Sequence, residues 1–213
     1  MNTRSGCVRV ALWVSVCVWL VGSSAPVRAD LILGNGFGPP YQSGTVFNDG
    51  RTLKGVGLEM KSGQTFAVDR FSVELEYLSG SPEITGHIYI NNGTIRPQDE
   101  LLTMNTVNVN AGTAVYDFVP GVSFTLFAGQ KYWFILSDGP SAGWARWSRH
   151  EPQQTPAGDP ANFLGYTFSE DNGMSWTSST IYNNLQIHGT YIPAPALAGV
   201  CLAGLMVVWR RRA

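Results

Sequence analysis

The chain has 213 residues and carries 14 Lys and Arg against 15 Asp and Glu, a formal net charge of −1 at pH 7. This balance gives no general attraction for polyanions, so we expect no nucleic-acid partner. The three cysteines, Cys7, Cys17 and Cys201, all lie near the two ends. The central part of the chain therefore holds no disulfide framework, thiolate nucleophile or cysteine-based metal site.

Residues 1–29 are organised like a secretory signal peptide. A start with two arginines precedes an apolar stretch at 10–21, and Val27 and Ala29 then place small residues at the −3 and −1 positions of a signal-peptidase site. A permanent N-terminal membrane helix is the alternative, but the apolar run is too short and a cleavage site follows it. We expect an N-terminal signal helix that signal peptidase removes during export.

Residues 30–191 have a suitable length for one domain with a single core. Six of the 14 cationic residues lie in the two terminal segments, 1–29 and 192–213, so 8 remain in the domain against all 15 Asp and Glu. Its net charge of −7 argues against anionic lipid as well as nucleic acid as a partner.

The domain reads as β-strands throughout. Apolar and polar residues alternate at 71–77, 84–91 and 185–191, so polar side chains such as Glu74 and His87 are expected to face solvent. Residues 132–136 are apolar on both faces, which favours a central strand. Turn residues separate strands about 8 to 12 residues apart, and the pattern predicts an all-β, antiparallel β-sandwich of jelly-roll type.

Two stretches outside these strands carry distinct signals. Residues 150–161 contain three prolines and few apolar residues, and we expect a long surface loop. The Asp-box pattern S-x-D-x-G-x-x-W follows at Ser169, Asp171, Gly173 and Trp176. In this hairpin the Asp caps turn amides, Gly takes a positive φ and Trp folds under the turn.

The Asp-box hairpin resembles those of sialidase propeller blades. A sialidase would carry several copies and an arginine triad, whereas this chain has one copy, so a structural role is expected. Calcium bound by Asp171 and Asn172 would need more oxygen ligands than the turn displays.

Trp144 and Trp147, together with Arg146, are the candidate ligand contacts. Three residues apart on a strand, the two tryptophans point to opposite faces, so one is expected in the core and one in solvent, where it could stack on a sugar ring. Two packed rims of the sandwich are the plainer interpretation.

The histidines show no metal-like spacing, and the neighbouring carboxylates Asp99 and Glu100 are expected in a turn, pointing apart or to solvent. The sequence therefore predicts no catalytic constellation, no metal, no cofactor and no enzymatic activity.

Residues 192–213 form a third segment. Pro193-Ala194-Pro195 precedes an apolar run of 14 residues at 196–209, and Arg210, Arg211 and Arg212 follow. As a helix this run is roughly 21 Å long, against a hydrocarbon core of about 30 Å, and snorkelling arginines recover part of the difference. The arginines are expected to stay cytoplasmic, which places the domain outside the cell. We expect a C-terminal transmembrane helix, and an ordinary core helix is the alternative.

This order of Pro-x-Pro, short apolar helix and arginine cluster resembles the PEP-CTERM sorting signal of bacterial envelope proteins. Alanine stands here where the commonest form of that signal has glutamate. The resemblance implies an inner-membrane intermediate and processing by an exosortase, a cysteine-dependent transpeptidase, which passes the protein to the cell surface or extracellular matrix.

The domain itself resembles the choice-of-anchor R domains of secreted bacterial proteins. The similarity rests on four places: 31–35 (LILGN), 66–68 (FAV), 129–133 (GQKYW) and the Asn-Gly-x-Ser-Trp hairpin at 172–176. It implies a sandwich fold, and the molecular function of that family is not established.

Three function hypotheses follow. The first is an exported, surface-sorted protein with a structural or adhesive role, with extracellular polysaccharide as a candidate partner. The second is a carbohydrate-binding module that uses exposed aromatic residues. The third is a secreted hydrolase.

Overall fold

The computed structural model describes residues 29–38, 41–48, 50–91, 96–139 and 143–193, and every regular element among them is a β-strand. The strands are β1 (Asp30–Gly34), β2 (Tyr41–Phe47), β3 (Leu53–Met60), β4 (Phe66–Gly80), β5 (Glu83–Ile90), β6 (Asp99–Asn108), β7 (Thr113–Phe118), β8 (Thr125–Leu126), β9 (Lys131–Asp138), β10 (Gly143–Arg149), β11 (Ala161–Ser169), β12 (Thr177–Ser179) and β13 (Leu185–Tyr191). This confirms the all-β prediction.

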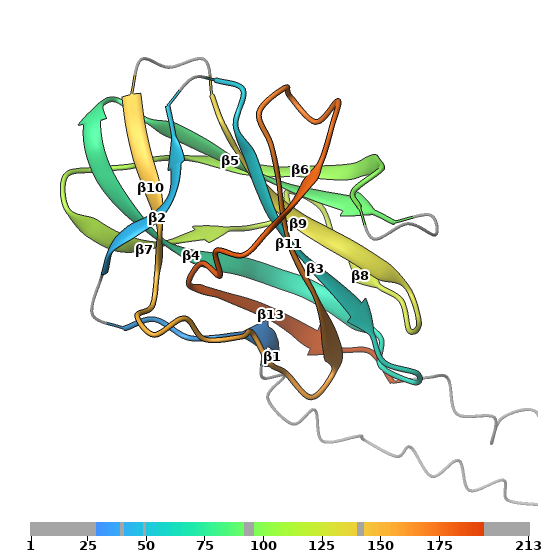
Figure 1. The fold of residues 1–213 in the computed structure, drawn as a ribbon. Coiled ribbons are helices and arrows are strands. Elements are labelled where there is room, and N and C mark those ends of the chain that lie inside the picture. The colour runs from blue at the N-terminus through green and yellow to red at the C-terminus, as the bar shows by residue number, and fades with distance from the viewer. Residues whose placement is uncertain (1–28, 39–40, 49, 92–95, 140–142, 194–213) are drawn as a thin grey trace, which may run out of the picture.

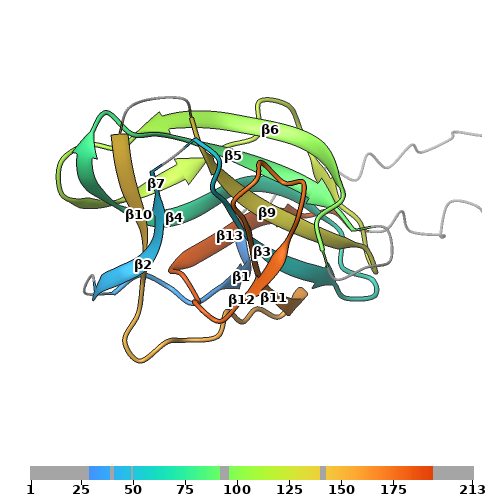
Figure 2. The same ribbon diagram turned by 45° about the horizontal axis from the view of Figure 1, so that its top comes forward.

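The strands form two antiparallel sheets that face one another as a β-sandwich (Figures 1 and 2). The first sheet contains β1, β13, β4, β10 and β2, with β7 and β8 also paired to β4; the second has the order β12-β11-β3-β9-β5-β6. The interior position of β9, between β3 and β5, confirms the prediction of a central strand at 132–136.

β4 is the axis of the first sheet. Phe71 pairs with both Phe118 of β7 and Ile187 of β13, while Leu75 pairs with both Ala114 of β7 and Trp147 of β10. β13 and β10 therefore share the side of β4 opposite β7, and they lie end to end.

Three asparagines form hydrogen bonds at the place where β10 and β13 meet. The backbone N–H of Asn184 donates to the Ser148 carbonyl at 2.8 Å, and the Asn183 side chain donates to the Trp147 carbonyl at 2.6 Å. Asn35 donates to the Asn183 carbonyl at 3.0 Å. Since Asn183 and Asn184 are fully buried, these bonds satisfy backbone groups that a continuous ladder would otherwise pair.

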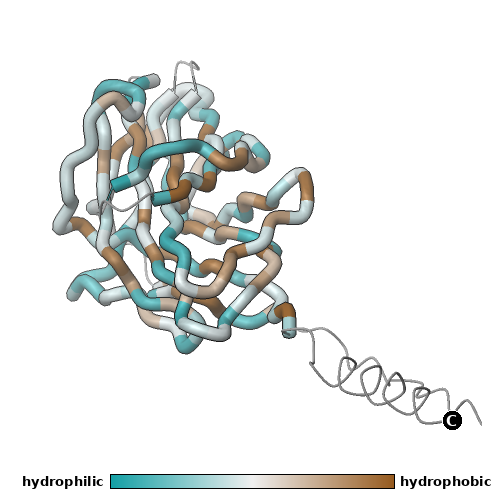
Figure 3. The backbone as a smooth tube through the Cα atoms, turned by 90° about the vertical axis from the view of Figure 1, so that its right-hand side faces the viewer, coloured by the Kyte–Doolittle hydropathy of each residue, from teal (hydrophilic) through white to brown (hydrophobic). Residues whose placement is uncertain are grey.

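The core lies between the sheets, where large aromatic side chains meet. The Phe71 ring contacts Phe134 and Trp147, with centroid separations of 5.5 and 5.9 Å. Hydrophobic and hydrophilic residues alternate along the strands, as the tube coloured by hydropathy shows (Figure 3). This alternation turns one side chain in two toward the core.

Two expectations about individual strands are wrong. The polar face of 71–77 is not exposed to solvent, because Ser72 and Glu74 are buried. The Ser72 hydroxyl donates to Asp117 at 2.5 Å, and Glu74 accepts from the Asn184 side chain at 2.7 Å. The expected turn at Asp99 and Glu100 is the beginning of β6.

The loop at 150–160 joins β10 to β11 and is largely exposed, as predicted. The expected signal helix within 1–29 and the transmembrane helix at 196–209 lie outside the described residues, apart from Ala29. Nowhere in the described ranges is there a helix long and apolar enough to cross a membrane.

Candidate functional site

Three polar side chains from adjacent strands meet on the outer face of the second sheet. On β9 the residues Tyr132, Phe134 and Leu136 point into the main core, so Ser137 shares the opposite face with Trp133 and Ile135. His87 of β5 lies opposite Ile135, which places it on the same outer face.

A β-bulge brings Glu100 to this face. Between the pairs Ile88–Leu102 and Tyr89–Glu100 the register of β5 and β6 shifts by one residue, leaving Leu101 as the extra residue. Leu102 packs against the core, and without the bulge the period-2 alternation would turn Glu100 inward as well.

The three side chains form a hydrogen-bonded chain. His87 Nδ1 is 2.7 Å from Glu100 Oε1, and His87 Nε2 is 2.8 Å from Ser137 Oγ. The His87 side chain is 15% exposed and that of Glu100 37% exposed. Both distances lie within the range of a nucleophile, a base and an orienting carboxylate in hydrogen-bond contact.

Hydrogen bonds hold Glu100 in its ionised form. Burial would raise the pKa of its carboxyl, but the hydrogen bonds from Thr103 (2.6 Å) and His87 outweigh burial, and the pKa lies below its ordinary value. Burial and the charge of Glu100 raise the pKa of Tyr89 to about 12, so Tyr89 stays a neutral phenol beside the carboxylate.

An apolar cluster separate from the main core borders this polar chain. It consists of Leu53, Trp133, Ile135 and Trp176, with Tyr89 packed against it. Trp133 lies flat over β3 because residue 57 is glycine, where a Cβ atom would stand 2.8 Å from the indole ring. The cluster borders the polar chain on the side of Ile135, which pairs with His87.

Trp176 reaches this cluster from the Asp-box hairpin. Asp171 accepts hydrogen bonds from the Ser175 backbone N–H at 2.8 Å and the Ser175 hydroxyl at 2.6 Å, and Gly173 has φ 83°. Ser169 Oγ accepts from the Gly173 N–H at 2.8 Å, and the Trp176 ring lies 6.3 Å from that of Tyr89. The turn therefore fixes Trp176 over the second sheet.

We expect Asp171→Ala to lower the melting temperature, because the hydrogen bonds to Ser175 and Ser169 are lost. Those bonds lower the pKa of Asp171 from 3.8 to about 2, so its contribution is complete above 3.8 and disappears as the pH falls to about 2. Thermal melts should show a gap between wild type and variant at neutral pH that closes near pH 2. Glu170→Ala, at the exposed neighbouring position, is the control; equal melts for all three proteins would contradict the capping role.

The candidate ligand contacts on β10 divide as expected between the two faces. Trp144 is 50% exposed, whereas Trp147 is fully buried and donates from Nε1 to the Asn184 carbonyl at 2.8 Å. Arg146 Nη2 forms an ion pair with Glu76 at 2.7 Å. The proposed ligand contact at Trp147 is therefore wrong, because no ligand reaches it, and Trp144 is the exposed aromatic residue of the three.

A buried lysine lies at the start of β3. Lys54 shares the inward side of the strand with Val56 and is 1% exposed. Its Nζ donates to Ser179 Oγ and lies 5.4 Å from the ring centroid of Tyr166 and 5.8 Å from that of Phe168. No described carboxylate forms an ion pair with it. Burial lowers the pKa of Lys54 to about 7.

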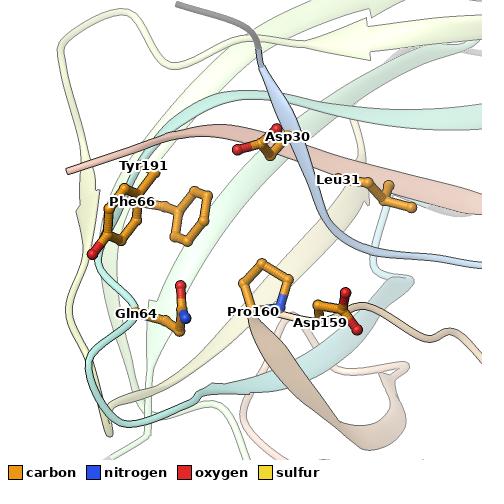
Figure 4. A pocket seen from close by; sticks show the side chains of 7 residues that line it. All are labelled: Asp30, Leu31, Gln64, Phe66, Asp159, Pro160 and Tyr191. Carbon is orange, nitrogen blue, oxygen red and sulfur yellow. The ribbon is translucent and has the colours of Figure 1, made fainter. Parts of the chain in front are cut away.

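A pocket of about 500 Å³ lies where β1 begins and β13 ends (Figure 4). Phe66 and Tyr191 form one wall, with ring centroids 5.5 Å apart. The other lining residues are Asp30, Leu31, Gln64, Asp159 and Pro160. Its polar groups are mostly acceptors, which suits a ligand rich in hydrogen-bond donors.

Sequence spacing did not predict the hydrogen-bonded chain of Ser137, His87 and Glu100. The described residues contain no group of three or more His, Cys, Asp or Glu placed to hold a metal ion. Of the site residues expected in the two terminal segments, Ala29 and Pro193 are described, whereas Val27, Ala194, Pro195 and the three arginines lie outside the described residues.

The sequence matches no known family model, and a search of curated proteins found no similar protein.

Proposed function

We propose that this is an exported, surface-sorted bacterial envelope or extracellular-matrix protein with a structural or adhesive role. Signal peptidase removes 1–29, and an exosortase-type protease processes the tail. We also propose that the N-terminal segment forms a signal helix, that the C-terminal segment forms a membrane helix, and that the sandwich is of jelly-roll type. The observation that carries it is the order of Pro193-Ala194-Pro195, an apolar run and three terminal arginines.

The arrangement of the two ends supports the proposal. Asp30, the residue after the proposed cleavage site, pairs with Gly189, two residues before the end of β13 (Figure 1). The backbone N–H of Ile192 donates to the Thr65 carbonyl at 2.8 Å. Hydrogen bonding of the domain therefore extends to the first residue of the C-terminal segment. Both targeting segments therefore join the sandwich at one end, which leaves the opposite end to project from the membrane.

We expect two tail variants to fail in different ways. Removing Arg210–Arg212 should weaken membrane retention, because nothing else opposes translocation of so short a helix. Replacing Pro193 and Pro195 with alanine should let the helix extend upstream and remove the extended backbone that a protease needs. Membrane-bound precursor should then accumulate while surface protein falls, as cell fractionation and immunoblotting would show. Unchanged fractions in both variants would contradict a sorting role.

Carbohydrate binding is the second candidate function. Trp144 offers an exposed indole face, and the acceptor-rich pocket beside Tyr191 offers a second place for hydroxyl groups. The domain charge of −7 favours neutral glycans over acidic ones. A glycan array distinguishes this candidate from a purely structural role.

A further inference from the structure

We propose that Ser137, His87 and Glu100 form an acyl-transfer site that hydrolyses carboxylic esters on the outer face of the second sheet. Ser137 is the nucleophile and His87 the general base, and Glu100 positions His87. This inference concerns the sandwich alone and stands whether or not the tail is processed.

The direction of each hydrogen bond supports these roles. An ionised carboxylate only accepts hydrogen bonds, so Glu100 requires the proton of neutral His87 to be on Nδ1. Nε2 then carries the lone pair and accepts from the Ser137 hydroxyl. This is the tautomer that a histidine needs in order to take a proton from a serine.

The reaction then balances with water as the second substrate. Ser137 Oγ attacks the ester carbonyl carbon while its proton passes to His87 Nε2, and the leaving alkoxide takes that proton as the C–O bond breaks. Water attacks the acyl-serine, gives a proton to His87, and the proton returns to Ser137 as the acid leaves. Ionised Glu100 stabilises the imidazolium in both halves.

The surroundings fit this chemistry. Thr85 lies directly across the ladder from Ser137, and its hydroxyl shares a 2.7 Å hydrogen bond with that of Thr106. When Thr106 donates in that bond, the Thr85 hydroxyl proton is left to donate to the oxygen that becomes negative. Leu53, Ile135 and Trp176 are themselves buried, so the accessible apolar surface beside His87 is the partly buried ring of Tyr89, whose centroid lies 6.4 Å from that of the imidazole. Because the site lies on a sheet face, the substrate class that fits is an acyl ester carried on an extended molecule.

The bulge at Leu101 favours a catalytic site over an ordinary polar sheet surface. Regular pairing alone would have kept Glu100 away from His87, and bulges that redirect a side chain are frequent next to active sites. A cross-strand ladder of hydrogen bonds without catalysis is the competing explanation, and it predicts an unreactive serine.

The test is covalent labelling of the full chain in detergent micelles with a fluorophosphonate probe, followed by peptide mapping. We expect wild type to be labelled at Ser137 and to hydrolyse p-nitrophenyl acetate. Ser137→Ala and His87→Ala should lose the label, with hydrolysis falling about 10²- to 10⁴-fold. Ser178→Ala, which removes an exposed serine of the same sheet, should behave as wild type.

Glu100→Gln tests the positioning role. The glutamine amide can donate to Nδ1 and so favours the tautomer with the proton on Nε2, which cannot accept from Ser137. We expect kcat to fall with KM and melting temperature nearly unchanged. Wild type that carries no label on Ser137, label that persists in Ser137→Ala, or full activity in Glu100→Gln would overturn the proposal; the mapping of wild type decides even if a variant fails to fold.

Discussion

Trp147→Ala is expected to lower the free energy of unfolding by about 3–5 kcal/mol, the range for removing a large aromatic side chain from a core. The Trp147 ring is fully buried, and its centroid lies 5.9 Å from that of Phe71 and 6.0 Å from that of Tyr166. The variant also leaves the buried Asn184 carbonyl without its indole donor, which adds a desolvation cost. Urea denaturation followed by circular dichroism measures the change.

Trp144→Ala is the matched control, because it makes the same substitution on the same strand. Trp144 is half exposed, and a surface substitution of this kind changes the free energy of unfolding by no more than about 0.5 kcal/mol. Similar losses in the two variants would mean that the faces of β10 are assigned wrongly.

Lys54→Met is expected to raise the free energy of unfolding at neutral pH, because it removes a buried amine with which no carboxylate of the described ranges forms an ion pair. The pKa falls from 10.5 in the unfolded chain to about 7 in the fold, which corresponds to a penalty on the order of 5 kcal/mol for the protonated form. The loss of the hydrogen bond to Ser179 offsets about 1 kcal/mol of the gain.

The sign of the pH dependence follows from the lowered pKa. Between about pH 7 and 10.5 the unfolded chain binds the proton that folded Lys54 has released, so wild type gains stability as the pH rises through this window. Lys54→Met should lack that gain, and its advantage over wild type should shrink toward pH 10. Lys61→Met, at an exposed lysine, should keep the wild-type slope. A wild-type stability independent of pH between 7 and 10 would refute the assignment.

Much of the architecture is encoded in local patterns. Residues 132–136 are apolar on both faces and form a strand between two others, and the three-residue spacing of Trp144 and Trp147 places them on opposite faces. Alternation does not reveal what covers a polar face, however. Glu74 is buried where β10 and β13 meet, and its partner there is Asn184, the residue before β13, 110 residues away in the sequence.

The chain of Ser137, His87 and Glu100 could not be predicted from spacing, because three conditions of tertiary structure create it. β9 must lie beside β5, β6 must pair with β5 on its other side, and one bulge must turn Glu100 outward. The only local hint was the outward position expected for His87 in a strand with an apolar inner face. Sequence separations of 13 and 50 residues carry no signal of their contact.

Mass spectrometry of the protein released from the cell surface tests the central proposal, export with processing at both ends, most directly. We expect a mature chain that begins at Asp30 and ends near Pro193-Ala194-Pro195, with no peptide from 201–209. Surface protein that retains peptides from 201–209 would contradict processing of the tail, and surface protein that retains residues 10–21 would contradict removal of the signal peptide.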